Sequence, residues 1–103
     1  MKFTKSLFMY MRGEDVATMQ FVLMELNEEY NFSQRKLNPT GYFGFDTVHL
    51  VRDFQNYFGL PATGTFDYQT YMMAETKHYS LLSSLQTPKS PAKTSSINDR
   101  KWW

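Results

Sequence analysis

Apolar residues recur at helical spacing between residues 14 and 30. Successive apolar positions alternate between steps of three and four residues: Val16, Met19, Leu23, Leu26 and Tyr30. This spacing places all five on one face of a helix. Gly13 is a permissible N-cap, and Glu14 and Asp15 bring negative charge to the positive end of the helix dipole. The sequence therefore predicts a first amphipathic helix over residues 14–30.

Two further segments have the same pattern. Residues 45–58 predict a second helix that ends before Gly59, a natural stop. Its buried face is expected to comprise Val48, Val51, Phe54 and Phe58. A third helix should begin at the N-cap Asp67 and run to about Leu82, with an inward face of Tyr71, Ala74, His78 and either Leu81 or Leu82. Loop-forming residues fill the intervals, so we expect an all-α fold, a compact three-helix bundle.

A short internal repeat precedes the second and third helices. Thr40-Gly41-Tyr42-Phe43 matches Thr63-Gly64-Thr65-Phe66, and each is followed four positions later by a threonine, Thr47 or Thr70. Both copies fall at a predicted helix start, which indicates that one backbone geometry is used twice. In each copy we expect the glycine to relieve a tight turn and the phenylalanine to fill the core.

The composition changes after Leu85. The chain has 103 residues, the usual length of one domain, and residues 1–84 hold seven basic and nine acidic residues. Residues 85–103 are rich in Pro, Ser, Thr and Lys and have a formal net charge of +3. Such a segment cannot form a core of its own. We therefore predict a helical domain over residues 1–84 and an extended docking arm over residues 85–103.

The arm ends in Arg100, Lys101, Trp102 and Trp103. Two tryptophans exposed to water at a chain end would be unusual, and aromatic residues beside arginine are typical interface anchors. We predict that these four residues dock onto other protein subunits of a larger assembly. The alternative is an unstructured terminus with no partner.

Composition also limits the remaining functions. The nearly neutral domain argues against nucleic-acid binding, and no apolar stretch is long enough to span a membrane. The apolar run at residues 7–11 is too short for a signal peptide. Cysteine is absent, which excludes disulfides and thiolate chemistry and favours an intracellular product. We expect synthesis in the cytoplasm without a signal peptide, followed by incorporation into a virion.

The sequence offers no candidate residues for catalysis or for binding a cofactor. His49 and His78 fall on different predicted helices, so no metal site is expected. Acidic pairs such as Glu28 and Glu29 are expected to be solvated, because nothing nearby in the sequence would desolvate a carboxyl group and prepare it for acid-base catalysis. No nucleophile elbow, phosphate loop or zinc-peptidase motif is present. We predict neither enzymatic activity nor a cofactor.

Several short motifs occur in an order that resembles a known family. They are Gly13-Glu14-Asp15-Val16 with Met19-Gln20; Gly41-Tyr42-Phe43-Gly44 with Thr47, Val51 and Phe54-Gln55; and Gly59-Leu60 with Gly64 and Thr70. Together they resemble the peptidoglycan-binding domain family, three-helix modules attached to many bacterial and phage cell-wall hydrolases. The resemblance runs from about Phe8 to about Met73. It departs from the family at Thr40 and Thr63, where an aspartate is common, and at Phe45, where a proline is frequent.

The resemblance implies binding of cell-wall glycan or stem peptide through loop and helix-entry residues. Candidates for stacking on sugar rings are Tyr42, Phe45 and Tyr68, and candidates for hydrogen bonding are Asp46, Asn56 and Gln69. The alternative is that the tyrosines only cover the edge of the core. For Gln20 and Gln55, which match recurrent family glutamines, we predict a structural role in which the amide satisfies loop backbone groups.

Two functions fit these expectations. The first is a non-catalytic peptidoglycan-binding-like module in a bacteriophage particle, in the tail or baseplate, where it contacts the cell wall or fastens neighbouring subunits. The second is an accessory subunit that brings a separate hydrolase to peptidoglycan. The first function requires the arm, whereas the second requires an intact glycan site on the domain.

Overall fold

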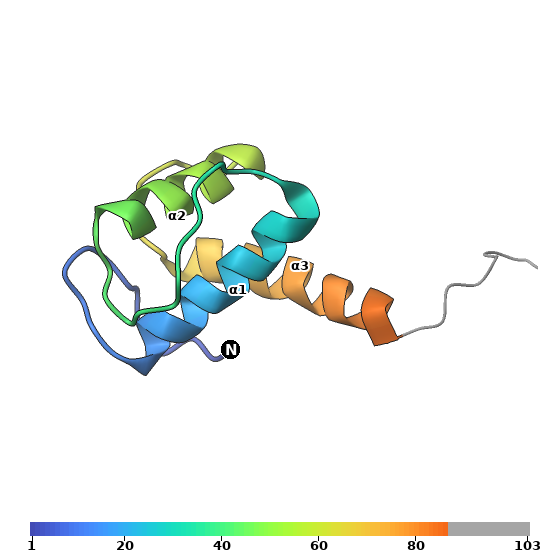
Figure 1. The fold of residues 1–103 in the computed structure, drawn as a ribbon, viewed down its shortest axis with the longest axis horizontal. Helices are drawn as coiled ribbons and strands as arrows, with labels where there is room; N and C mark the ends of the chain where they lie inside the picture. Colours follow the sequence, from blue (N-terminus) through green and yellow to red (C-terminus); the bar gives the residue numbers. More distant parts are fainter. Residues whose placement is uncertain (87–103) are drawn as a thin grey trace, which may run out of the picture.

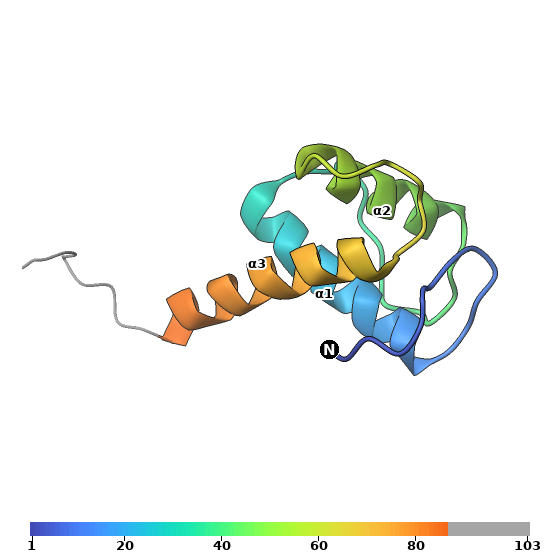
Figure 2. The same cartoon turned by 180° about the vertical axis from the view of Figure 1, so that it is seen from behind.

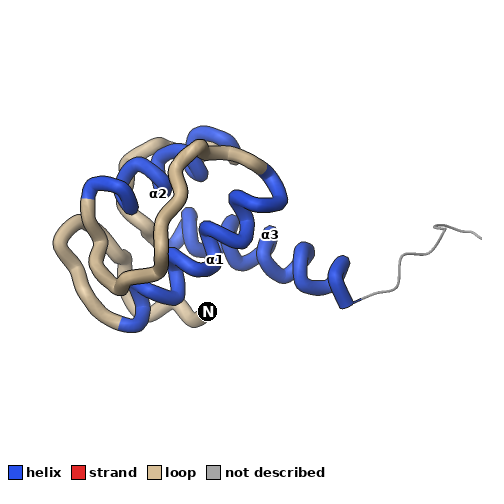
Figure 3. Tube along the Cα trace, viewed as in Figure 1, coloured by secondary structure: helices blue, strands red, loops and turns tan. Residues whose placement is uncertain are grey.

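Three helices form the body of the protein (Figure 1). The computed structural model describes residues 1–86, in which α1 spans Glu14–Tyr30, α2 spans Phe45–Tyr57 and α3 spans Tyr68–Gln86. The described chain outside the helices consists of loops and turns (Figure 3). The predicted all-α class is confirmed. The main difference is that α3 continues past Leu82, and its last turns extend beyond the body (Figure 2).

The core lies where α1 packs against α2 and α3. Its fully buried members come from all three helices and from both repeat loops: Val16, Met19, Leu23, Leu26, Phe43, Leu50, Val51, Phe54, Phe66 and Ala74. The predicted face of α1 is confirmed from Val16 to Leu26, and Tyr30 at the helix end is half-buried. Phe43 and Phe66 fill the core as expected.

The buried face of α2 differs from the prediction. Leu50 is completely buried, whereas Val48 and Phe58, expected inside, are only half-buried. The reason is that Thr47 and Gln55 also point inward, which centres the buried face on Leu50 and Phe54. Both are polar residues that a search for an apolar stripe passes over. On α3, Leu81 is the more buried of the two alternatives, because Leu82 is 39% exposed.

Gln20 connects α1 to the first repeat loop. Its Nε2 donates hydrogen bonds of 2.9 Å to the carbonyl oxygen of Tyr42 and to Oγ1 of Thr47. Its Oε1 accepts a 3.0 Å bond from the backbone N–H of Gly41. The side chain is 1% exposed, so these bonds satisfy an amide and two backbone groups that water hardly reaches. The predicted structural role of Gln20 is confirmed.

Gln55 repeats this arrangement at the second loop. Its Nε2 donates to the carbonyl oxygen of Thr65 at 3.0 Å and to Oγ1 of Thr70 at 2.9 Å, and its Oε1 accepts from the N–H of Gly64 at 3.0 Å. Gly41 and Gly64 have φ angles of +84° and +82°. Glycine adopts this left-handed conformation without strain. The sequence repeat is therefore a repeated structure: loop glycine, core phenylalanine, helix-entry threonine and a buried glutamine that joins them.

The N-terminal segment lies across both repeat loops. Leu7 exchanges two backbone hydrogen bonds with Phe66, of 3.0 and 2.8 Å. Farther along, Tyr10 donates to the carbonyl of Phe43 at 2.8 Å, and Phe43 donates to the carbonyl of Met11 at 2.9 Å. The segment therefore joins two loops that are distant in sequence and holds the two helix entries in a fixed arrangement.

A polar contact joins α1 and α3. Nε2 of His78 lies 2.7 Å from Oε1 of Glu25, and the two side chains are 15% and 39% exposed. His78 faces inward as predicted, and this carboxylate is its partner. Within residues 1–86, no three His, Asp or Glu side chains are grouped so that they could hold a metal ion. No helix of this described part is both long and apolar enough to cross a membrane.

Candidate functional site

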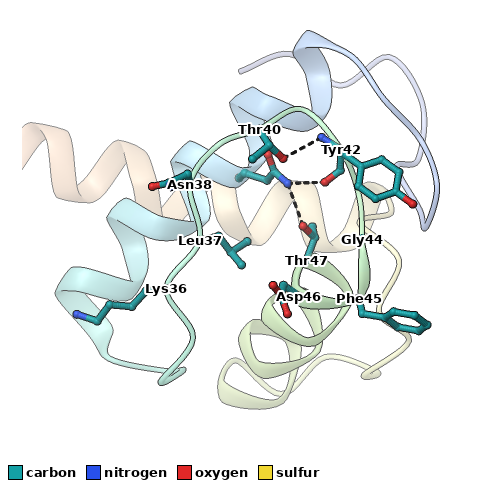
Figure 4. A pocket seen from close by; sticks show the side chains of 10 residues that line it. Lys36, Leu37, Asn38, Thr40, Tyr42, Gly44, Phe45, Asp46 and Thr47 are labelled. Atoms are coloured by element: carbon teal, nitrogen blue, oxygen red, sulfur yellow. Dashed lines mark hydrogen bonds between the residues drawn. The ribbon is translucent and has the colours of Figure 1, made fainter.

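A pocket of about 390 Å³ opens beside the start of α2. Figure 4 shows it between the loop that follows α1 and the first turn of α2. It is lined by Gln20, Lys36, Leu37, Asn38, Thr40, Tyr42, Gly44, Phe45, Asp46 and Thr47. Its volume falls within the range of about 300–1,000 Å³ that is usual for small-molecule sites. The first repeat loop therefore forms part of a concave surface.

The inner end of the pocket is rigid and polar. Gln20 and Thr47 are both buried, and the hydrogen bond between them fixes their side chains. Oγ1 of Thr40 accepts a 3.2 Å bond from the N–H of Tyr42, which holds the rim of the loop. Positions fixed by such bonds need little reorganisation when a ligand binds.

Two aromatic rings project on one side of the pocket in the view of Figure 4. The side chain of Phe45 is 67% exposed, although it begins a helix and has no role in the core. The guanidinium of Arg12 lies 4.4 Å from the centre of the Tyr42 ring, a cation-π contact that keeps this half-buried ring in place. Aromatic rings that are wholly or partly exposed beside a pocket can stack on the apolar face of a flat ligand.

The pocket also has charges of both signs. Lys36 and Asp46 line it, and Nη1 of Arg35 lies 3.6 Å from Oδ1 of Asp46. The Asp46 side chain is 75% exposed and that of Arg35 is 42% exposed, so solvent screens this ion pair and it adds little stability. The Asp46 carboxylate can therefore exchange Arg35 for a ligand group at little cost in free energy.

The two helix entries differ at the residue before the helix. At α3, Oδ1 of Asp67 accepts a 3.0 Å hydrogen bond from the N–H of Thr70 and so caps the helix. The equivalent position before α2 is Gly44, which has no side chain to cap it. First-turn N–H groups that receive no side-chain acceptor from the N-cap can bind an anion or carbonyl group from outside. The pocket lies at this second kind of entry.

The structure brings together three of the six predicted ligand-binding residues. Tyr42, Phe45 and Asp46 line the pocket, whereas Asn56, Tyr68 and Gln69 do not. Asn56 lies exposed near the end of α2, and Tyr68 and Gln69 lie exposed at the start of α3. The Tyr68 ring packs edge-on against Phe3, with centroids 5.1 Å apart. The predicted docking residues Arg100, Lys101, Trp102 and Trp103 lie outside the described residues.

Sequence reasoning missed the wall of the pocket formed by the loop after α1. Lys36, Leu37 and Asn38 line it, yet they have no motif and no periodicity. They reach the pocket because Asn27 anchors the loop: its amide donates to the carbonyl of Ser33 and accepts from the N–H of Ser33, both at 2.9 Å. The available signal in the sequence was an asparagine, Asn27, directly after Leu26 of the predicted apolar face; in the structure it is 9% exposed.

Solved structures of other proteins resemble this fold. The crystal structure of the SleB N-terminal domain is 29% identical with a TM-score of 0.61, and the match covers 75% of this chain and 99% of that domain. The crystal structure of a Burkholderia AP3 phage endolysin is 26% identical with a TM-score of 0.60, over 70% of this chain. The match spans 25% of that endolysin. No curated protein sequence matches this chain.

A family model described as "Putative peptidoglycan binding domain" matches residues 12–73. The match includes both repeat loops, both buried glutamines and the whole pocket at the start of α2. It begins at Arg12, so residues 1–11 lie outside it, as does the end of α3. With more than half of its length matched, this chain belongs to the peptidoglycan-binding domain family.

Proposed function

We propose that the chain is a non-catalytic module that binds peptidoglycan in the pocket at the start of α2. The observation that supports this most directly is the composition of that pocket in a member of a peptidoglycan-binding family. It combines the half-buried ring of Tyr42 and the exposed ring of Phe45 with the charges of Lys36 and Asp46 at an uncapped helix entry.

Peptidoglycan presents chemical groups that match these side chains. Its sugar rings have apolar faces for stacking on aromatic side chains, and its stem peptides carry amides, carboxylates and amines. Lys36 can pair with a carboxylate, and Asp46 can pair with an amine. The N–H groups of the first turn of α2 can donate to a carbonyl or carboxylate oxygen.

The absence of catalysis is part of this proposal. General acid-base catalysis requires a carboxyl group or histidine held where its proton affinity suits the reaction. Asp46, the acidic residue of the pocket, is 75% exposed and paired with Arg35, so it lacks the desolvated setting of a catalytic acid. The pocket residues include no histidine, serine or cysteine. They suit binding.

We propose further that this module is a structural component of a bacteriophage particle, in the tail or baseplate. The similarity to a phage endolysin supports a phage setting, and the basic, aromatic end of the arm supports attachment to another protein subunit. The alternative is an accessory subunit that brings a separate hydrolase to the wall, and the same similarity is compatible with it.

Co-sedimentation of the full chain with purified bacterial sacculi tests the binding proposal. We expect the protein to pellet with sacculi and to stay in solution with an equal mass of cellulose. Raised salt screens the basic arm, so pelleting that persists there reports the domain rather than the arm. A chain without residues 98–103 is the matched control and should pellet equally well. No pelleting of either chain would contradict the proposal.

Particle assembly distinguishes the phage component from the accessory subunit. In a phage that encodes this chain, deletion of residues 98–103 should reduce the amount of the protein in purified virions at least tenfold, while the domain still pellets with sacculi. Quantitative immunoblotting of purified particles measures this. Virions that hold the shortened chain at the wild-type level would contradict attachment through the arm, and absence of the intact chain from virions would favour the accessory subunit.

A further inference from the structure

A second concave surface lies between α1 and the last turns of α3. This groove has a volume of about 410 Å³ and an apolar lining of Phe21, Met24, Pro39 and Leu81. Phe21 is 50% exposed although it belongs to a long, well-packed helix. None of these four residues lines the pocket at the start of α2. The proposed wall-binding site therefore leaves the α1/α3 groove unused.

One edge of the α1/α3 groove is acidic. Glu25, Glu28 and Glu29 line it, and all three belong to the second half of α1. Of the described residues that line the groove, none is Lys or Arg. Glu25 already pairs with His78, whereas Glu28 and Glu29 are exposed to solvent. The groove is therefore suited to a segment that carries large apolar side chains next to positive charge.

The same chain contains such a segment. Trp102 and Trp103 follow directly after Arg100 and Lys101, and the chain has no other tryptophan. We propose that residues 100–103 dock in the α1/α3 groove of their own molecule, with an indole ring on Phe21 and Leu81 and the basic side chains beside Glu28 and Glu29.

The length of the arm permits this contact. Leu81 lies about one and a half turns before the end of α3 at Gln86. The 15 residues between Gln86 and Trp102 span at most about 50 Å when fully extended and about 20 Å on average as a flexible chain. Both lengths exceed the distance back along α3. A tether of this length gives an effective concentration on the order of millimolar, which favours the groove of the same molecule over that of a second copy.

Docking within the molecule would regulate the attachment proposed above. The residues that sit in the groove are the ones that would hold a neighbouring subunit, so the two contacts exclude each other. A partner subunit must then bind the arm more tightly than the groove does. Free copies would keep their tryptophans covered until they meet that partner.

Tryptophan fluorescence of the full chain tests the proposal, because both tryptophans belong to the docked segment. We expect emission shifted to the blue, and acrylamide quenching severalfold weaker, relative to a synthetic peptide of residues 94–103. Both signals should be independent of protein concentration. Emission equal to that of the free peptide would overturn the proposal. A blue shift that grows with protein concentration would also overturn it, because the groove of a second copy would then be the site.

Two groove variants locate the docked segment. Phe21→Ser, and the double variant Glu28→Lys/Glu29→Lys, should each return emission and quenching to the values of the free peptide. Lysine near the C-terminal end of α1 is favourable for the helix dipole, so the double variant keeps the fold. Phe8→Ser is the matched control, since Phe8 is 51% exposed and lies outside the groove. A blue shift that survives both groove variants would place the segment elsewhere and overturn the proposal.

Discussion

Replacing Gln55 with leucine is expected to lower the free energy of unfolding by about 3–5 kcal/mol. Leucine fills most of the same volume, but the N–H of Gly64 and the hydroxyl of Thr70 lose the Gln55 amide as their partner. The carbonyl of Thr65 also loses a donor and keeps the backbone N–H of Asp67 at 3.0 Å. Each buried polar group left without a partner costs about 1–3 kcal/mol. Gln55 is completely buried, so water cannot replace it. Urea denaturation of the two chains measures the difference.

The neighbouring residue provides the control for this change. Asn56 is exposed, and Asn56→Ala should alter the free energy of unfolding by less than about 0.5 kcal/mol. Gln20→Leu should destabilise about as much as Gln55→Leu, because Gln20 makes the same three kinds of hydrogen bond at the first loop. A loss below about 1 kcal/mol for both glutamine variants would show that the loops can satisfy their own backbone groups.

The helices of this fold could be predicted because their cause is local. The apolar periodicity of α1 and the end of α2 before Gly59 depend on residues that lie within a few positions of each other in the sequence. The repeat also predicted its own geometry, since two copies of one loop with equal spacing to a threonine imply equal backbone paths. Gln20 and Gln55 complete the repeated structure, and both are buried and hydrogen-bonded to the loop backbone as expected.

The pocket could not be predicted from the sequence, because it depends on contacts between distant residues that produce no local pattern. Lys36 and Asn38 reach the entry of α2 only because Asn27 fixes the start of their loop. His78 pairs with Glu25 across 53 positions, and nothing in the spacing of either residue indicates it. The N-terminal segment likewise has no period, and backbone bonds to Phe66 determine its path. Such features depend on how packed elements meet.

Loss of the three pocket residues is expected to weaken binding to sacculi about 100-fold. In the variant Tyr42→Ala/Phe45→Ala/Asp46→Ala, each lost ring removes a stacking contact of about 0.5–1.5 kcal/mol, and the carboxylate removes a charged hydrogen bond of about 1.5–3 kcal/mol. A total of about 3 kcal/mol corresponds to about two orders of magnitude in the dissociation constant. Sedimentation against increasing amounts of sacculi measures that constant.

The other three predicted residues supply the matched control: Tyr68 and Gln69 lie at the second helix entry, and Asn56 lies near the end of α2. The variant Asn56→Ala/Tyr68→Ala/Gln69→Ala changes three exposed positions outside the pocket, so binding should stay within about twofold of wild type. All six side chains lie outside the buried glutamine networks, and both variants should therefore unfold cooperatively near the wild-type temperature. If the second variant loses binding and the first retains it, the wall ligand binds at the start of α3. The uncapped entry at Gly44 would then have no part in recognition.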